Sequence, residues 1–351
     1  MMLVLVLAAA IWGLGVWLKT PVQARLYMIG LLYVAVLFVQ FALPDGHPLR
    51  ESLGGTPGQW LVLGGLVAMV VLYRSVLVRV RGRAQAVEAA RAPSEAPRHS
   101  GPFSEVELDR YARHIVLREV GGAGQKRLKD AKVLVVGAGG LGSPALLYLA
   151  AAGVGTIGVI DDDIVSLSNL QRQIIHTDAS SGTPKVFSAQ ASMTALNPHV
   201  TVRPYQRRLT PEIAADLFAD YDVILDGSDS FSTRQTVNAA AVETGTPLVA
   251  GAITQWEGQV TIYDPAGGAP CLACIFPEAP APGLAPSCAE AGVIGALPGI
   301  IGSAMALEAI KLITGAGTPL RGAMLIWDGL DADARRLSIK RRAECPICGD
   351  I

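Results

Sequence analysis

The stretch KVLVVGAGGLG, residues 132–142, decides the fold of this 351-residue chain. Its first five residues are mostly β-branched and predict a buried strand, and the segment that follows it, Ser143–Ala152, has the composition of a helix. Between them, Gly137, Gly139 and Gly142 would let the backbone approach a phosphate at the helix N-terminus, where free amides and the helix dipole favour an anion. The sequence therefore predicts an α/β fold with a Rossmann-like, mostly parallel sheet and flanking helices.

The residues after this unit indicate which nucleotide it binds. A second predicted strand, Thr156–Ile160, ends at Asp161, which lies at about the right distance for a carboxylate that grips ribose hydroxyls. An NAD-dependent oxidoreductase would share all of this and stays the alternative. Two further cations, Arg172 and Lys185, suit the heavier negative charge of a triphosphate better than that of a pyrophosphate bridge.

A third strand-like run, Asp222–Leu225, leads into the sequence DGSDS at residues 226–230. Asp229 would then lie at the carboxyl end of a strand, where ligands of α/β proteins bind and where carboxylate oxygen could hold a hard cation such as Mg²⁺. Hydride transfer needs no such metal, so this aspartate favours the triphosphate reading.

The cysteines predict a structural metal site. All five follow residue 270, and four form the CxxC pairs Cys271/Cys274 and Cys345/Cys348. Paired CxxC motifs in a long chain are typical of a tetrahedral four-cysteine Zn²⁺ site in a reducing compartment, which would leave no open position for a catalytic water. The zinc would fasten the C-terminal tail to the domain. The five histidines show no ligand spacing and are interpreted as structural.

Apolar residues make up 51% of the chain, and the excess over an ordinary soluble protein lies in the first 80 residues. Three runs, 2–18, 26–43 and 60–78, are about long enough to cross a membrane and predict three transmembrane helices. A linker over 81–102, expected to begin as a juxtamembrane helix and to fray into a flexible tether, would lead to a domain over 103–351. A signal peptide is disfavoured because no basic residue precedes the first run, and three helices buried in a core would be apolar on every side.

Basic residues set the expected orientation. Lys19 and Arg25 flank the first loop and four arginines lie near the end of the third run, so the N-terminus should be outside and the large domain should face the cytoplasm at the inner membrane. The net charge of −1 gives no support to a nucleic-acid partner.

Taken in order, these motifs resemble the MoeB/ThiF family. The resemblance covers about residues 103–348 and rests on RYARHIVL (110–117), GAGGLG, DDDIVSLSNLQRQ (161–173), Pro184–Lys185, DGSDS, CLAC, CAEAGV (288–293) and CPICG. It implies an adenylyltransferase fold and a homodimer that uses ATP to adenylate the C-terminal glycine carboxylate of a ubiquitin-like sulfur carrier ending in Gly-Gly. Pyrophosphate would leave, and the pathway would be molybdopterin or thiamine biosynthesis.

The resemblance also implies roles for matching residues. ATP is expected to contact the glycine loop through Gly137, Gly139, Gly140 and Gly142. The other expected contacts are Asp161, Ser168, Asn169, Leu170, Gln171, Arg172, Lys185, Asp229 and Ser230. Arg172, Lys185 and Asp229 with its Mg²⁺ would be catalytic, together with Arg113 reaching in from the other subunit. Cys288 would be either a sulfur-relay nucleophile or a bystander.

Two features depart from the family pattern: Ser230 stands where the family commonly has asparagine, and the membrane segment has no counterpart. The chemistry itself needs no general base, because a C-terminal carboxylate with a pKa of about 3.5 is ionised at neutral pH. Catalysis would consist of positioning and charge neutralisation. A non-catalytic scaffold that binds the carrier is a third possibility beside the oxidoreductase.

Overall fold

The computed structural model describes residues 2–91, 102–278 and 292–351. The chain divides into two compact units, Met1–Arg98 and His99–Ile351. Each unit is described by itself.

Unit 1 consists of four helices, α1 (Met2–Trp17), α2 (Val22–Ala42), α3 (Pro48–Leu53) and α4 (Pro57–Arg91). By length and composition, α2 and the Pro57–Leu77 part of α4 could each cross a membrane. The first expected span is shorter than predicted: α1 has 16 residues, which is about 24 Å of helix against a hydrocarbon core of about 30 Å.

Two further features of unit 1 concern the loop after the second span and the end of α4. The loop after the second span contains the short helix α3, which begins after His47, whose ring accepts a hydrogen bond from the Leu49 amide. Helix α4 continues to Arg91, well into the expected linker. Inside the unit, Val4, Val36 and Trp60 are buried together, and the hydroxyl of Tyr33 donates to the Trp60 carbonyl at 2.7 Å.

Unit 2 is built on an eight-stranded sheet with the order β3-β2-β1-β4-β5-β6-β7-β8. The strands are β1 (Lys132–Val136), β2 (Thr156–Ile160), β3 (Thr201–Tyr205), β4 (Val223–Asp226), β5 (Leu248–Ile253), β6 (Glu257–Tyr263), β7 (Ala323–Asp328) and β8 (Asp333–Ser338). The first five are parallel, and β6 to β8 add antiparallel strands to one edge. The expected mostly parallel, Rossmann-like sheet is confirmed.

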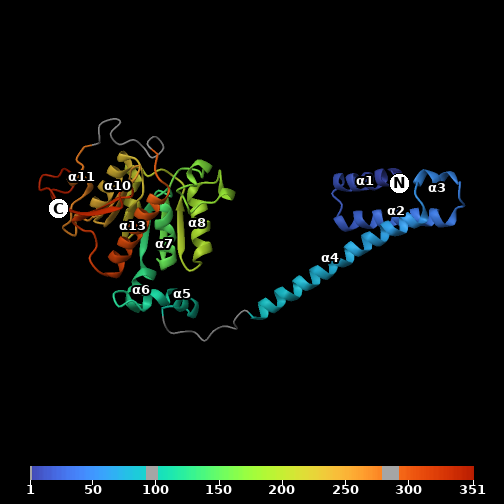
Figure 1. Cartoon of the computed structure of the whole chain (residues 1–351), viewed down its shortest axis with the longest axis horizontal. Coiled ribbons are helices and arrows are strands. Elements are labelled where there is room, and N and C mark those ends of the chain that lie inside the picture. Colours follow the sequence, from blue (N-terminus) through green and yellow to red (C-terminus); the bar gives the residue numbers. More distant parts are fainter. Residues whose placement is uncertain (1, 92–101, 279–291) are drawn as a thin grey trace. The chain divides into compact units, whose positions relative to one another are not determined.

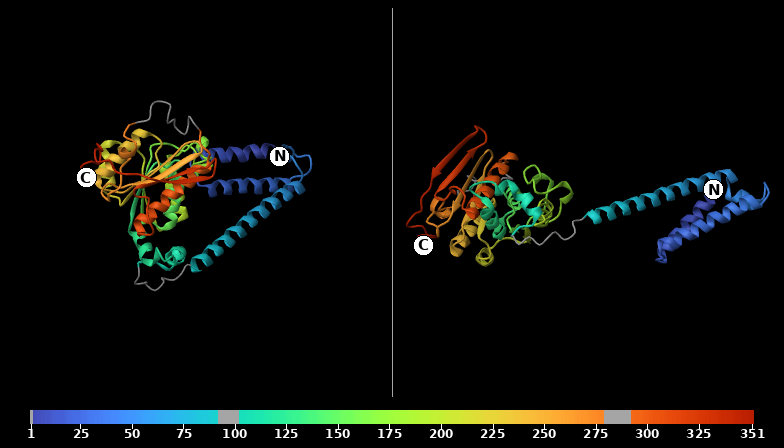
Figure 2. Two further views of the ribbon diagram at one scale, coloured as in Figure 1. Left: turned by 60° about the vertical axis from the view of Figure 1, so that its left-hand side comes forward. Right: turned by 90° about the horizontal axis from the view of Figure 1, so that it is seen from below.

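Helices cover both faces of this sheet (Figures 1 and 2). One face carries α7 (Gly142–Ala152), α8 (Lys185–Leu196) and α13 (Ala296–Thr314), and the other carries α9 (Pro211–Phe218), α10 (Phe231–Thr244) and the short α11 (Leu272–Ile275). Helix α13 is also apolar and long enough to span a membrane, but 44% of its most apolar window is buried inside the unit, as expected for a packed helix. Two 3-10 turns, Leu167–Asn169 and Asp178–Ser180, lie between β2 and α8.

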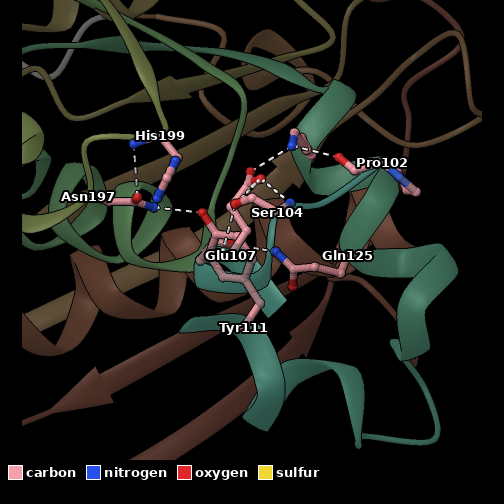
Figure 3. Close-up of polar contacts among 9 residues, drawn as sticks. Pro102, Ser104, Glu107, Tyr111, Gln125, Asn197 and His199 are labelled. Atoms are coloured by element: carbon pink, nitrogen blue, oxygen red, sulfur yellow. Dashed lines mark hydrogen bonds and ion pairs between the residues drawn. The ribbon is translucent and has the colours of Figure 1, made fainter. Parts of the chain in front are cut away.

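Helices α5 (Glu105–Ile115) and α6 (Gly121–Asp130) precede the sheet, and buried polar contacts hold them against α7 (Figure 3). The side-chain amide of Asn197 donates to the Tyr111 hydroxyl at 2.8 Å and to the Ala150 carbonyl at 2.7 Å. Gln125 donates to the Ala152 carbonyl at 2.8 Å. These contacts tie α5 and α6 to the C-terminal end of α7.

The entry of the chain into unit 2 is held in the same region. Lys129 donates to the Pro102 carbonyl at 2.7 Å and pairs with Glu107 at 2.6 Å. Glu107 in turn completes the capping box of α5 with Ser104. Phe103 is buried edge-on against the Tyr111 ring. The chain therefore enters beside the amino end of β1.

Candidate functional site

A pocket of about 270 Å³ opens at the carboxyl ends of β1, β2 and β4. Because β4 lies beside β1 on the side opposite β2, the strand order reverses at this point, and ligands of open α/β sheets bind at such switch points. Its wall contains the glycine loop, the segment Asp161–Asp163 after β2 and the segment Gly227–Ser230 after β4.

The glycine loop has its form because two of its residues cannot carry a side chain. Gly137 has φ +92°, a conformation that side chains with a Cβ rarely adopt. A Cβ on Gly142 would lie 2.0 Å from the Gly137 carbonyl oxygen, so the start of α7 can approach the loop only without one. Gly139 and Gly140 line the pocket itself.

Asp161 holds the loop in place and faces the pocket. One carboxylate oxygen accepts from the Ala138 amide at 2.8 Å and the other from the Asp163 amide at 2.8 Å. The Ala138 carbonyl oxygen forms a hydrogen bond of 2.9 Å with Nε2 of His176. His176 is buried, and burial lowers the pKa of its imidazole from the ordinary value of 6.5, with the Lys185 charge contributing in the same direction. His176 thus supports the glycine loop through its contact with the Ala138 carbonyl.

The two predicted cations, Arg172 and Lys185, both line the pocket. Lys185 is only 4% exposed, and its ammonium pairs with the Asp163 carboxylate at 2.7 Å. Arg172 donates to the Asn169 side chain at 3.0 Å. Both positive charges are therefore held in place by neighbours from the segment between β2 and α8.

Three arginines in the pocket were missed by the sequence reasoning: Arg207, Arg208 and Arg234. The first two follow β3, which carries no motif, so only the strand order reveals that they reach this edge. Arg234 could have been found, since it lies one helical turn after Ser230, the N-cap of α10. Its guanidinium donates to the Ser228 carbonyl at 2.7 Å.

Two aspartates of the DGSDS segment lie at the end of β4 and differ in environment. Asp226, which was also missed, is 2% exposed and accepts from the Ser228 amide at 2.9 Å. Burial raises the pKa of Asp226, and the nearby Arg234 charge partly offsets the increase. Asp229 is exposed at the pocket wall, and Ser230 beside it caps α10 through the Thr233 amide.

The pocket contains buried polar atoms that lack a partner among the described residues. These are the side-chain oxygen of Gln173 and the hydroxyl of Ser228, both in the pocket wall. Leaving a buried polar group unsatisfied costs about 1–3 kcal/mol, and such groups commonly complete their bonding with a ligand or water. Together with the glycine loop and the cations, they fit a bound nucleotide with several phosphates.

Not every expected contact lines the pocket. Ser168, Leu170 and Gln171 do not line it, and Asn169 acts on it through Arg172. Arg113 is exposed on α5 and does not line the pocket of its own chain. Its proposed role in a second subunit stays a prediction.

The four predicted zinc ligands do come together. The sulfurs of Cys271 and Cys345 lie 3.6 Å apart, those of Cys274 and Cys348 3.5 Å apart, and those of Cys271 and Cys274 3.9 Å apart. Four sulfurs at about 2.3 Å from a tetrahedral Zn²⁺ would be separated by about 3.8 Å. All four are buried, so the donor set and its spacing fit zinc. Cys288 lies outside the described residues.

Residues 111–347 match the ThiF family. A sulfur carrier protein adenylyltransferase of Thermus thermophilus is 51% identical over 254 residues, covering 71% of this chain and 93% of that protein. The SAMP-activating enzyme E1 of Haloferax volcanii is 48% identical over 244 residues, covering 70% of this chain and 90% of the other. The probable adenylyltransferase/sulfurtransferase MoeZ of Mycobacterium tuberculosis is 50% identical over 247 residues, covering 70% of this chain and 63% of its own length.

Among solved structures, PaaA has a TM-score of 0.59 at 24% identity and covers 79% of this chain and 89% of its own. The complex of Escherichia coli MccB with AMPCPP and MccA has a TM-score of 0.61 at 20% identity, covering 71% and 76%. At these identities the similarity concerns the fold.

Proposed function

Because the chain belongs to the ThiF family and is an adenylyltransferase, we propose that it uses ATP to adenylate the C-terminal glycine carboxylate of a ubiquitin-like sulfur carrier ending in Gly-Gly. The observation that carries this proposal is the pocket, in which the glycine loop and five cationic side chains meet at one edge of the sheet: Arg172, Lys185, Arg207, Arg208 and Arg234. The named substrate of the Thermus thermophilus relative supports the choice of a sulfur carrier. Molybdopterin biosynthesis is the proposed pathway, with thiamine biosynthesis as its alternative.

The reaction joins two anions. A carboxylate oxygen of the carrier attacks the α-phosphorus of ATP, a carboxyl–phosphate bond forms, and the bond from the α-phosphorus to its bridging oxygen breaks. Pyrophosphate then leaves with the electron pair, and no proton has to be removed from the nucleophile. The amides of the glycine loop and the cations of the pocket oppose the charge that gathers on the leaving group.

Lys185 and Asp161 have distinct parts in this scheme. Lys185 already pairs with the Asp163 carboxylate, so binding of a phosphate requires only that its ammonium exchange one anionic partner for another. Asp161 would accept from the ribose hydroxyls with the lone pairs that its two backbone amides leave free.

Magnesium would be held by Asp229. Within the described part of the chain, no hydrogen bond or ion pair is recorded for its carboxylate, which lies exposed at the pocket wall as a hard oxygen donor. When bound, the ion neutralises phosphate charge. Four thiolates, from the two CxxC pairs, would hold the structural zinc.

We also propose that residues 1–80 anchor the enzyme in the inner membrane, with 81–102 as linker and 103–351 facing the cytoplasm. The support is the low burial of α2 and of the first part of α4, since only 6% of the most apolar window of each is buried. A homodimer in which Arg113 serves the opposite pocket completes the proposal.

Pyrophosphate exchange tests the central claim. Labelled pyrophosphate should enter ATP only when the carrier is present, because exchange requires a reversible adenylate. Lys185→Ala and Asp229→Ala should abolish exchange, whereas Lys126→Ala should retain it, since Lys126 pairs with Asp130 on α6 and does not line the pocket. Wild-type exchange in both pocket variants would refute the assignment, and carrier-independent binding of NAD would favour the oxidoreductase.

A further inference from the structure

Helix α10 touches the nucleotide pocket at one end and the cysteine cluster further along. Its first turn contains Thr233 and Arg234, which line the pocket. Arg234 also holds the Ser228 carbonyl at 2.7 Å, so the position of α10 decides where the DGSDS segment lies. A shift of this helix would therefore change the pocket wall.

One face of α10 continues from the pocket to the cysteines. Arg234, Asn238 and Val242 are spaced four residues apart, which places them one above another on a single helix face. Val242 packs against the four cysteines. From Arg234 to Val242 the helix rises about 12 Å.

Asn238 is the polar member of this face. It is 2% exposed, and its side-chain oxygen accepts a hydrogen bond of 2.8 Å from the Leu272 amide. Leu272 lies inside the first CxxC pair, between Cys271 and Cys274, and begins α11. A buried carboxamide thus fixes the backbone of the zinc-binding turn to the helix whose first turn forms the pocket wall.

We infer that zinc binding and nucleotide binding are coupled through α10, with Asn238 as the positioning residue that joins the zinc-binding turn to the pocket. Zinc fixes the Cys271–Cys274 turn and so presents the Leu272 amide to Asn238, while a nucleotide fixes the first turn of α10 from the other end. Each ligand restrains the same helix, so each should tighten the binding of the other by an equal factor. The inference rests on the proposed function, since it requires that the pocket bind ATP.

The rate of zinc release tests the coupling in the intact, zinc-loaded chain. Zinc released to an excess of a chromophoric chelator is followed with and without AMPCPP and Mg²⁺, after calorimetry has shown that this analogue binds. The methylene group of AMPCPP replaces the oxygen between the α- and β-phosphorus, so the analogue cannot be an adenylyl donor in the proposed reaction. The analogue should slow zinc release by about threefold to tenfold, the range expected for one buried hydrogen bond. If the free nucleotide merely chelated zinc, it would speed zinc release rather than slow it.

Three variants locate the effect. Asn238→Ala should release zinc at one rate with or without the analogue, and Asn238→Asp, which keeps an oxygen acceptor for the Leu272 amide, should retain the slowing. Gln235→Ala, an exposed change on the same helix, should behave as wild type.

The outcomes separate the two proposals. If the analogue binds the wild-type chain but leaves zinc release unchanged, the coupling is overturned while the proposed function stands. Equal slowing in wild type and Asn238→Ala overturns the role of Asn238. Failure of the analogue to bind at all overturns the proposed function and the coupling with it.

Discussion

Two glycines of the same loop should respond to alanine in opposite ways. The Cβ of Gly142→Ala would lie 2.0 Å from the Gly137 carbonyl oxygen, and since real contacts of a Cβ essentially never fall below 3.0 Å, the loop and α7 must separate by about 1 Å. The new Cβ of Gly139→Ala meets only the Gln173 side chain, at an ordinary 3.6 Å, on the wall of the pocket. The first change should therefore damage the fold and the second the ligand site.

The sizes of the two effects follow from these contacts. Forcing an atom into a packed backbone costs about 1–3 kcal/mol, and at about 2–4 °C per kcal/mol for a unit of this size, Gly142→Ala should lower the melting temperature by roughly 2–12 °C. Gly139→Ala should leave the melting temperature within about 2 °C of wild type and weaken ATP binding at least tenfold, because the methyl group occupies space beside the loop amides.

Thermal unfolding of the detergent-solubilised chain and calorimetry with ATP would measure both quantities. Equal melting temperatures for wild type and Gly142→Ala would refute the close-approach argument. Unchanged ATP affinity in Gly139→Ala would show that the phosphates bind elsewhere in the pocket.

Three other predictions concern the metal, the second subunit and pH. Cys345→Ser should reduce bound zinc from one ion per chain to near zero and make the C-terminal tail sensitive to protease; unchanged zinc content would contradict the site. When Arg113→Ala and Lys185→Ala chains are mixed, up to about half of the dimers should regain one working pocket if the arginine acts in trans, and no recovery despite demonstrated subunit exchange would exclude that arrangement. Folding lowers the pKa of His176 from 6.5, so the unfolded state binds a proton more readily than the folded state. Wild type should therefore lose stability, relative to His176→Gln, as pH falls below about 6.5. If the melting temperatures of the two proteins change in parallel from about pH 7.5 to 5, this prediction is wrong.

The sequence predicted those parts of the site that a local pattern encodes. The strand before the glycine loop, the carboxylate of Asp161 and the four cysteines each follow from spacing along the chain. The structure places the end of that strand and Asp161 at the pocket, and it gathers the four cysteines in a separate cluster. Arg207 and Arg208 could not be found in this way, because their place in the pocket depends on β3 being two strands from β1 in the sheet. Gln173 was not predicted because only the structure shows that its side-chain oxygen is buried without a hydrogen-bond partner among the described residues.

Helix ends were the other weak point. Hydropathy extended the first apolar run to residue 18, whereas α1 ends at Trp17 and is shorter than the helices that could cross a membrane by length alone. Composition placed a linker that begins as a helix from residue 81, and α4 continues to Arg91 because alanine and arginine favour helix as strongly as the apolar residues before them.

The entry of the chain at Pro102 has a mechanical consequence. A pull on the preceding segment would be carried by Lys129, which holds the Pro102 carbonyl and Glu107, and by the buried ring of Phe103. These contacts lie at the amino end of β1, while the glycine loop lies at its carboxyl end, so the tension would enter at one edge of the sheet and leave the other edge undisturbed. If the proposed anchor pulls on the chain, the pocket lies away from the point of attachment, and a variant without residues 1–80 would need to begin before Pro102 to keep these contacts.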